Sequence, residues 1–132
     1  MSEIAYIDAS AFVKLFALEP ESEAVAAAMD AEWTNLVASE ILSVEAFRAA
    51  VRIGGDAPAN ASRCLRRVVL LPLSSEVRAR ACRIGTPELR ALDAIHLATA
   101  LSQDAQVGAI FTYDKRLAQA STAAGLQVLA PT

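Results

Sequence analysis

Four acidic residues stand where the surrounding sequence is apolar, and their side chains could support metal-ion chemistry. Asp8 and Asp114 each end a short apolar run, whereas Glu45 and Asp93 lie inside segments with helical periodicity. One such acid is most often a helix cap or a salt-bridge partner, because burying an unpaired carboxylate is costly. Four converging carboxylates would repel one another, and a divalent cation would relieve that repulsion.

The donor chemistry of these acids favours Mg²⁺ (or Mn²⁺) as a cofactor. Both ions prefer oxygen ligands, keep several waters and bind the phosphate oxygens of a substrate. Such a site can activate a water and stabilise negative charge on a phosphoryl group, which indicates metal-assisted phosphodiester hydrolysis. The spacings of the four acids do not by themselves prove that the acids converge.

Alternating strands and helices are expected to position these acids. We expect strands at residues 3–8, 33–39, 68–73, 108–113 and 126–129. We expect helices at residues 9–18, 21–29, 40–53, 58–67, 75–84, 87–102 and 115–124, with Thr86 as the cap of the sixth. This order is typical of an α/β fold with a mainly parallel sheet. In such a sheet the ligand site lies outside the carboxyl ends of the strands, so Asp8 and Asp114 should point into one crevice.

Length and composition predict one cytoplasmic domain that spans residues 1–132. A chain of 132 residues that is 55% hydrophobic can bury a core without disulfides or a structural metal. Its two cysteines, Cys64 and Cys82, form no CxxC motif, which suggests buried thiols in a reducing compartment. Neither a signal peptide nor a membrane-spanning run is expected, because charged and polar residues interrupt the apolar segments.

Several neighbouring residues have more ordinary explanations than catalysis. His96 follows Asp93 by three residues and could be a general base, but its apolar neighbours favour a structural, hydrogen-bonded role. The aromatic residues Tyr6, Trp33 and Tyr113 could stack on bases, yet positions in or beside strands are more typical of a core. A receiver domain and an aspartyl-nucleophile phosphohydrolase both need a second acid soon after the first strand. Ala9 and Ser10 follow Asp8 instead, so both classes are disfavoured.

Four stretches of the chain together resemble the PIN-domain family, and more closely its VapC-type toxins. The stretches are YIDASAFVKLF (6–16), SEILSVEAFRA (39–49), LRALDAIHLATA (89–100) and FTYDKRL (111–117). They follow the family's order across essentially the whole chain. The resemblance implies a three-layer α/β/α PIN-like fold with about five strands.

The resemblance also implies an activity and its residues. The four acids match the family's acidic metal site, and Ser10 and Thr112 match supporting hydroxyl positions beside it. The implied function is that of a Mg²⁺- or Mn²⁺-dependent endoribonuclease, the toxin of a toxin–antitoxin pair. The implied partners are RNA, a small VapB-like antitoxin and a second copy of the chain in a homodimer. The alternative is a catalytically silent PIN-like module that binds RNA or protein. Lys14 matches a common family position, but it could equally lie over apolar surface, so its role is left open.

The distribution of charge is more informative than the net charge of −3. Residues 46–90 carry nine basic and three acidic side chains, a local net charge of +6. These basic side chains could contact an RNA backbone, solvent or an antitoxin. The candidate RNA contacts are Arg48, Arg52, Arg63, Arg66 and Arg67.

Overall fold

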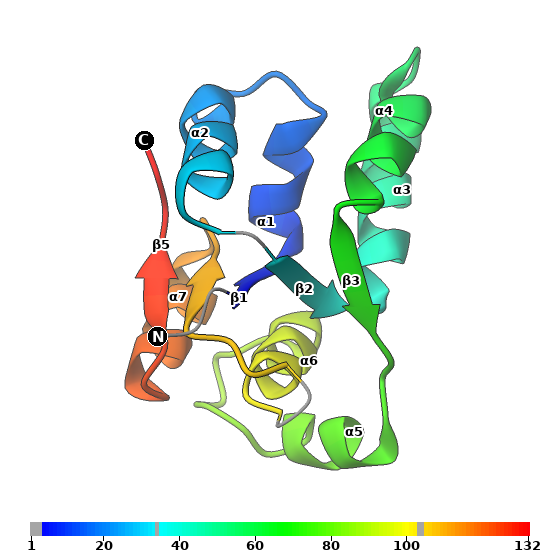
Figure 1. Ribbon diagram of the computed structural model, residues 1–132. Coiled ribbons are helices and arrows are strands. Elements are labelled where there is room, and N and C mark those ends of the chain that lie inside the picture. Colours follow the sequence, from blue (N-terminus) through cyan, green and yellow to red (C-terminus); the bar gives the residue numbers. More distant parts are fainter. Residues whose placement is uncertain (1–3, 34, 103–104) are drawn as a thin grey trace.

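Five short parallel strands form the centre of the structure, a computed structural model that describes residues 4–33, 35–102 and 105–132 (Figure 1). The strands are β1 (Ile4–Ile7), β2 (Asn35–Ser39), β3 (Val68–Leu71), β4 (Ala109–Phe111) and β5 (Gln127–Leu129). Their order across the sheet is β3-β2-β1-β4-β5, with every neighbouring pair parallel. The expected fold class, a three-layer α/β/α arrangement around a parallel five-stranded sheet, is confirmed.

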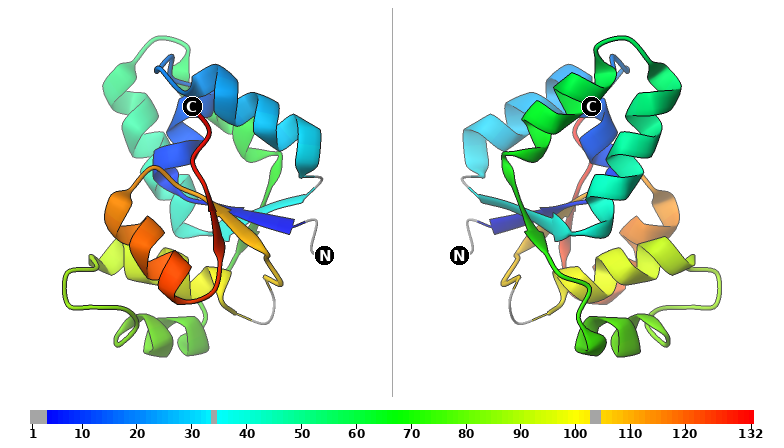
Figure 2. Two further views of the ribbon diagram at one scale, coloured as in Figure 1. Left: turned by 90° about the vertical axis from the view of Figure 1, so that its left-hand side faces the viewer. Right: turned by 90° about the vertical axis from the view of Figure 1, so that its right-hand side faces the viewer.

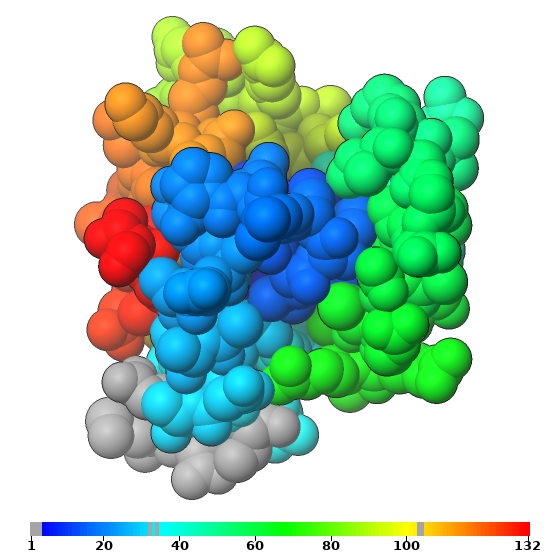
Figure 3. All heavy atoms as spheres, turned by 90° about the horizontal axis from the view of Figure 1, so that it is seen from above, coloured from blue at the N-terminus to red at the C-terminus, as the bar shows by residue number. Residues whose placement is uncertain are grey.

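Helices cover both faces of this sheet. The helical segments are α1 (Ala9–Phe12), a 3₁₀ turn (Val13–Leu15), α2 (Ser22–Glu32), α3 (Ile41–Ile53), α4 (Ala57–Leu65), α5 (Ser75–Ala81), α6 (Ala91–Ala100) and α7 (Lys115–Ala123). In Figure 1, α1, α2 and α4 lie above the strands, and α5, α6 and α7 lie below them. The perpendicular views of Figure 2 show the sheet between these two layers. Seen from above, α1 and α2 lie between the C-terminal segment and the pair formed by α3 and α4 (Figure 3).

The central strands are apolar on both faces because both faces are covered. Ala5, Tyr6 and Ile7 of β1 are fully buried, as are Ile110 and Phe111 of β4. A strand buried on both sides reads as a continuous apolar run rather than an alternating one, which is why both segments could be recognised from the sequence.

The order of the strands reverses at β1. From β1 the chain moves to β2 and then β3 on one side, and it returns to β4 on the other side. Ligands of open α/β sheets bind at such a reversal, beyond the carboxyl ends of the strands. The residues that follow β1 and β4 therefore meet at the favoured position for a site. Within the described residues, no helix is long and apolar enough to cross a membrane.

Two expected helices differ from those observed. The helix expected at 9–18 is α-helical only through Phe12, and the 3₁₀ turn continues it to Leu15. The helix expected to start after Thr86 begins at Ala91 instead. Residues 86–89 form a turn in which the Leu89 N–H donates to the Thr86 carbonyl at 3.1 Å. The side chain of Leu89 folds back against Gly85 and packs on the core, so tertiary packing outweighs the local cap signal.

Candidate active site

Asp8 is a buried carboxylate at the carboxyl end of β1, and its side chain is held by three donors. The Ser10 hydroxyl lies 2.7 and 2.9 Å from its two oxygens, and the Thr112 hydroxyl donates to Oδ2 at 2.6 Å. The Ala11 N–H donates to Oδ1 at 3.0 Å, so Asp8 also caps α1. Only 2% of Asp8 is exposed. Burial raises the pKa of Asp8, and the three hydrogen bonds oppose that rise by favouring the carboxylate.

Thr112 and Ser10 connect Asp8 to the loop after β4. The Thr112 hydroxyl accepts a hydrogen bond from the Asp114 N–H at 3.1 Å, and the Ser10 hydroxyl accepts one from the Tyr113 N–H at 2.8 Å. Asp114 Oδ1 accepts from the Leu117 N–H at 2.9 Å and caps α7. Asp8 and Asp114 thus both act as helix caps, which is the ordinary role of an acid at a helix start. At Asp8 the second oxygen, Oδ2, is also engaged, because it accepts from the Thr112 and Ser10 hydroxyls.

Asp93 lies in the first turn of α6, and its pKa is affected by the other three acids. Its pKa is raised to about 6, first by burial and then by the negative charges of Asp114, Asp8 and Glu45. The imidazole of His96 acts in the opposite direction. Like charges raise a carboxyl pKa only when they lie near it. Asp93 is therefore within electrostatic range of three acids that come from other parts of the chain.

Glu45 reaches this neighbourhood from α3 and pairs with His96 of α6. His96 Nε2 lies 2.7 Å from Glu45 Oε1, and Nδ1 lies 2.6 Å from the Tyr6 hydroxyl. That hydroxyl also accepts from the Ser39 N–H at 2.8 Å. The structural, hydrogen-bonded role expected for His96 is what the geometry shows.

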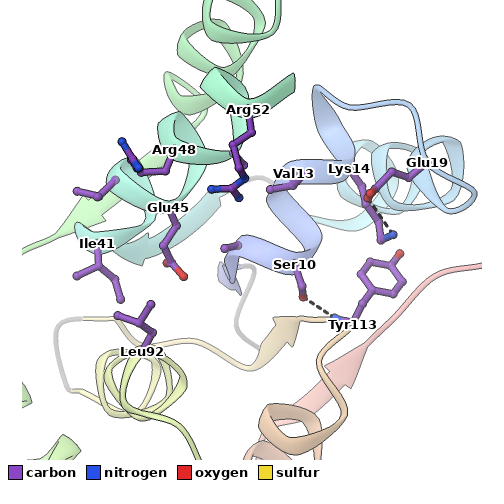
Figure 4. A pocket seen from close by; sticks show the side chains of 13 residues that line it. Ser10, Val13, Lys14, Glu19, Ile41, Glu45, Arg48, Arg52, Leu92 and Tyr113 are labelled. Carbon is purple, nitrogen blue, oxygen red and sulfur yellow. Dashed lines mark hydrogen bonds and ion pairs between the residues drawn. The ribbon is translucent and has the colours of Figure 1, made fainter. Parts of the chain in front are cut away.

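A cavity of about 820 Å³ opens beside the acids, between α1, α3 and α6 (Figure 4). Glu45 points from α3 toward α6, the helix that carries Leu92. Arg52 extends from α3 toward α1, whereas Arg48 on the same helix points away from Ser10. The cavity wall combines apolar side chains with charged ones, as a binding site for a charged ligand requires. Its lining residues are Ala9, Ser10, Val13, Lys14, Glu19, Ile41, Val44, Glu45, Arg48, Ala49, Arg52, Leu92 and Tyr113.

Lys14 lies at the edge of this cavity and is tied down by acids and an aromatic ring. Its ammonium lies 2.6 Å from Glu21 Oε1 and 3.2 Å from Glu19 Oε1. It also lies 4.7 Å from the centre of the Tyr113 ring. The hydrogen bond to Glu21 is the main reason that the pKa of Lys14 is raised. Lys14 is therefore a fixed positive charge at the wall and does more than cover apolar surface.

The candidate arginines fall into two groups. Arg48 and Arg52 line the cavity, whereas Arg63, Arg66 and Arg67 lie on or just after α4 and do not line it. Arg67 instead pairs with Asp30 of α2 at 2.9 Å. The structure therefore joins only the α3 arginines to the acidic neighbourhood.

The donor set of the site fits a hard divalent cation in its chemistry. The clustered groups are carboxylate and hydroxyl oxygens, and mutual repulsion already raises the pKa of Asp93. Within the described part of the chain, no three His, Cys, Asp or Glu side chains are arranged to hold a metal ion directly. Of the four acids only Glu45 lines the cavity, and Mg²⁺ in proteins usually keeps several waters in addition to one or two carboxylates.

Tyr6 is the site residue that sequence reasoning missed, because its position in a strand favoured the core. It is fully buried, yet its hydroxyl bonds the Ser39 N–H and the imidazole of His96, and His96 in turn contacts Glu45. The signal in the sequence was a single tyrosine in an otherwise aliphatic strand, since a buried Tyr hydroxyl usually has a partner.

Comparisons with a family model and with known proteins agree on one family. The model of the PIN domain matches residues 5–123. Ribonuclease VapC46 of Mycobacterium tuberculosis is 37% identical over 127 residues, covering 96% of this chain and 97% of its own. Ribonuclease VapC35 of the same organism is 37% identical over 130 residues, covering 96% of both chains.

Solved structures share the fold at lower identity. A toxin–antitoxin complex from Klebsiella pneumoniae superposes with a TM-score of 0.74 at 21% identity, covering 97% of this chain and 98% of the other. The Sarcin-Ricin loop cleaving toxin VapC20 of Mycobacterium tuberculosis gives a TM-score of 0.71 at 15% identity, covering 92% and 95%.

Proposed function

Because this chain belongs to the PIN-domain family, we propose that it is a divalent-metal-dependent endoribonuclease that acts as the toxin of a toxin–antitoxin pair. One observation carries the proposal: the Thr112 hydroxyl joins the Asp8 carboxylate to the Asp114 N–H, and Glu45 contacts His96, one turn after Asp93 on α6. The ribonuclease names of relatives that match nearly the whole chain support the same activity.

In the proposed mechanism, Asp8, Glu45, Asp93 and Asp114 hold Mg²⁺ or Mn²⁺, directly or through waters. The bound ion would supply an activated water and stabilise charge on the phosphoryl oxygens. Ser10 and Thr112 orient the Asp8 carboxylate through the hydrogen bonds described above. Burial and neighbouring negative charges raise the pKa of Asp93, and the positive charge of a bound cation would favour the ionised form of all four carboxylates.

The cavity beside the acids is the proposed path of the RNA backbone. Arg48 and Arg52 provide positive charge along α3, whereas Lys14 at the opposite wall is paired with Glu19 and Glu21. Phosphate contacts of this kind give affinity without reading sequence. We propose further that the chain acts in the cytoplasm as a homodimer whose activity is inhibited by a small VapB-like antitoxin. A toxin–antitoxin complex among the structures of similar fold supports the antitoxin.

The direct test is cleavage of a structured RNA by the purified chain. Internal cleavage should require Mg²⁺ or Mn²⁺, and Asp8→Asn, Asp93→Asn or excess chelator should each abolish it. Full activity in either variant or in chelator would contradict the proposal. An RNA that is bound but never cut, with both ions supplied, would favour the silent binding module.

The cellular target calls for a second experiment. RNA ends should be mapped after brief induction of the wild-type chain and, in parallel, of Asp8→Asn. New ends that appear only with the wild-type chain would identify the cleaved RNA and the site within it. Identical end maps for the two chains would count against a toxin ribonuclease.

A further inference from the structure

A run of hydrogen bonds leads from the interior of the sheet to the acidic cluster. It starts at the Ser39 N–H, at the end of β2, passes through the Tyr6 hydroxyl of β1 and the imidazole of His96, and ends at Glu45. Only 1% of His96 is exposed, so both ring nitrogens depend on these protein partners rather than on water. Tyr6 and His96 also pack edge to face, with ring centroids 5.6 Å apart.

The partners of His96 indicate where its proton lies. Glu45 Oε1, at 2.7 Å, is an acceptor when ionised, so Nε2 must carry a proton for that contact to be attractive. At the other nitrogen, burial raises the pKa of the Tyr6 phenol and keeps its O–H intact. With the phenol oxygen accepting from Ser39, its O–H is available to donate to Nδ1. An Nδ1–H tautomer would leave the Nε2 lone pair facing a carboxylate.

We propose that His96 is a positioning residue for Glu45: its Nε2–H holds one carboxylate oxygen and leaves the other directed to the acidic cluster. This role rests on the proposed function, since it matters to catalysis only if Glu45 helps to hold the cation. Glu45 sits on α3, and its flexible side chain is 21% exposed. Fixing such a side chain before a cation arrives lowers the entropy lost on binding.

Binding of Mn²⁺ alone, measured without RNA by the electron paramagnetic resonance signal of the free ion, tests the role. His96→Leu should weaken Mn²⁺ binding about 10–100-fold, the usual effect of removing a partner that orients a metal ligand. His96→Gln should recover most of that affinity, because its amide can donate toward Glu45. The control is Ser121→Ala, which removes a buried hydroxyl that has no partner among the described residues and should leave binding unchanged.

A double-mutant comparison separates positioning from general damage. If His96 acts through Glu45, Glu45→Gln combined with His96→Leu should bind Mn²⁺ about as weakly as Glu45→Gln alone. Effects that simply add would contradict the role. If His96→Leu does not fold, Tyr6→Phe decides the matter, since it keeps the ring and removes only the hydroxyl. Tyr6→Phe should weaken Mn²⁺ binding in the same direction, and unchanged binding would overturn the role.

The chain has one histidine, so ¹⁵N NMR of the imidazole reads this site without interference. The spectrum should show a proton on Nε2, and Glu45→Gln should shift that signal. A neutral ring protonated only at Nδ1 would overturn the proposal. A wild-type chain that binds no Mn²⁺ would refute the proposed function and the positioning role together. Wild-type binding that His96→Leu leaves intact would refute the positioning role alone.

Discussion

At the scale of single residues, the acids of this site oppose the stability of the folded chain. Asp8 is buried with three donors around it, and the pKa of Asp93 is raised to about 6 by burial and by neighbouring carboxylates. A folded chain without a bound cation carries that repulsion as a cost. Sites arranged for a cation commonly show this pattern, because ligand binding and not folding compensates the charge.

Asp93→Asn should therefore stabilise the metal-free chain while it abolishes cleavage. Between the ordinary pKa of 3.8 and about 6, folded Asp93 binds more protons than unfolded Asp93. The free energy of unfolding consequently falls as pH rises through that window. Because Asp93 is partly exposed, we expect a gain of only about 1 kcal/mol at pH 7.5 after discounting for solvent screening.

Urea unfolding in chelator at pH 4 and pH 7.5 measures this effect. The advantage of Asp93→Asn over the wild-type chain should be larger at pH 7.5, where wild-type Asp93 is ionised. An equal difference at both pH values, or a less stable variant at pH 7.5, would show that the acids do not repel one another as described.

At the scale of elements, two helices begin on residues of the site. Asp8 caps α1 and Asp114 caps α7, and both follow strands at the place where the strand order reverses. Each of these carboxylates thus follows a strand and starts a helix. Helix α3 carries Glu45, then Arg48 one turn later and Arg52 two turns later, and all three line the cavity.

Substitutions at Asp114 should separate capping from catalysis. Asn is as good a helix cap as Asp, so Asp114→Asn should keep the stability of the chain and abolish cleavage. Asp114→Ala should abolish cleavage and also lower the stability by about 1 kcal/mol. Thermal unfolding and RNA cleavage of the two variants give the comparison. Normal cleavage by Asp114→Asn would reduce Asp114 to a cap.

The two groups of arginines should differ in their effect on RNA binding. Each phosphate that a basic side chain neutralises on single-stranded RNA contributes about 0.7 to the slope of log affinity against log salt. Replacing both Arg48 and Arg52 by Gln should therefore lower that slope by about 1.4. Salt titrations in the catalytically inactive Asp8→Asn background measure the slope.

The matched control for these titrations replaces Arg63 and Arg66 of the α4 region by Gln. This pair removes the same charge from a place away from the cavity, so it should leave the slope nearly unchanged. Equal changes for both pairs would mean that general charge, and not the cavity, attracts the RNA.

At the scale of the whole molecule, the buried sheet and the site are distinct in composition. The core cluster contains apolar residues from the strands and from the helices on both faces. The acids lie at the edge of that core, where the strands end. The apolar core should therefore hold the fold together without a cation, and a cation should add stability by linking segments that are far apart in sequence.

Added Mn²⁺ should raise the unfolding midpoint of the wild-type chain and leave its secondary structure unchanged. At 100 times the dissociation constant, a ligand that binds only the folded state adds about 2.7 kcal/mol. Circular dichroism in chelator and in Mn²⁺ measures both quantities. The control is Asp8→Asn, in which Asn can still accept the Ala11 N–H but carries no charge. A similar rise in the variant would place the bound ion elsewhere.

Local sequence patterns were sufficient for most of the elements. The apolar runs of β1 and β4 and the acids that follow them are visible without any structure, because strand burial and helix capping depend on nearby residues. The same logic failed between Thr86 and Arg90. A plausible helix start was overruled there by the packing of Leu89 on the core.

Tertiary structure alone decided which distant residues meet. The sequence by itself determined a parallel α/β chain with acids at its strand ends. Only the fold placed β4 beside β1, joined Tyr6 to His96 across 90 positions, and set the α3 arginines, rather than those of α4, against the cavity. The physical reason is that periodicity and capping act over a few residues. Partners across the sheet depend instead on strand order and on the packing of whole helices, which no short stretch of sequence contains.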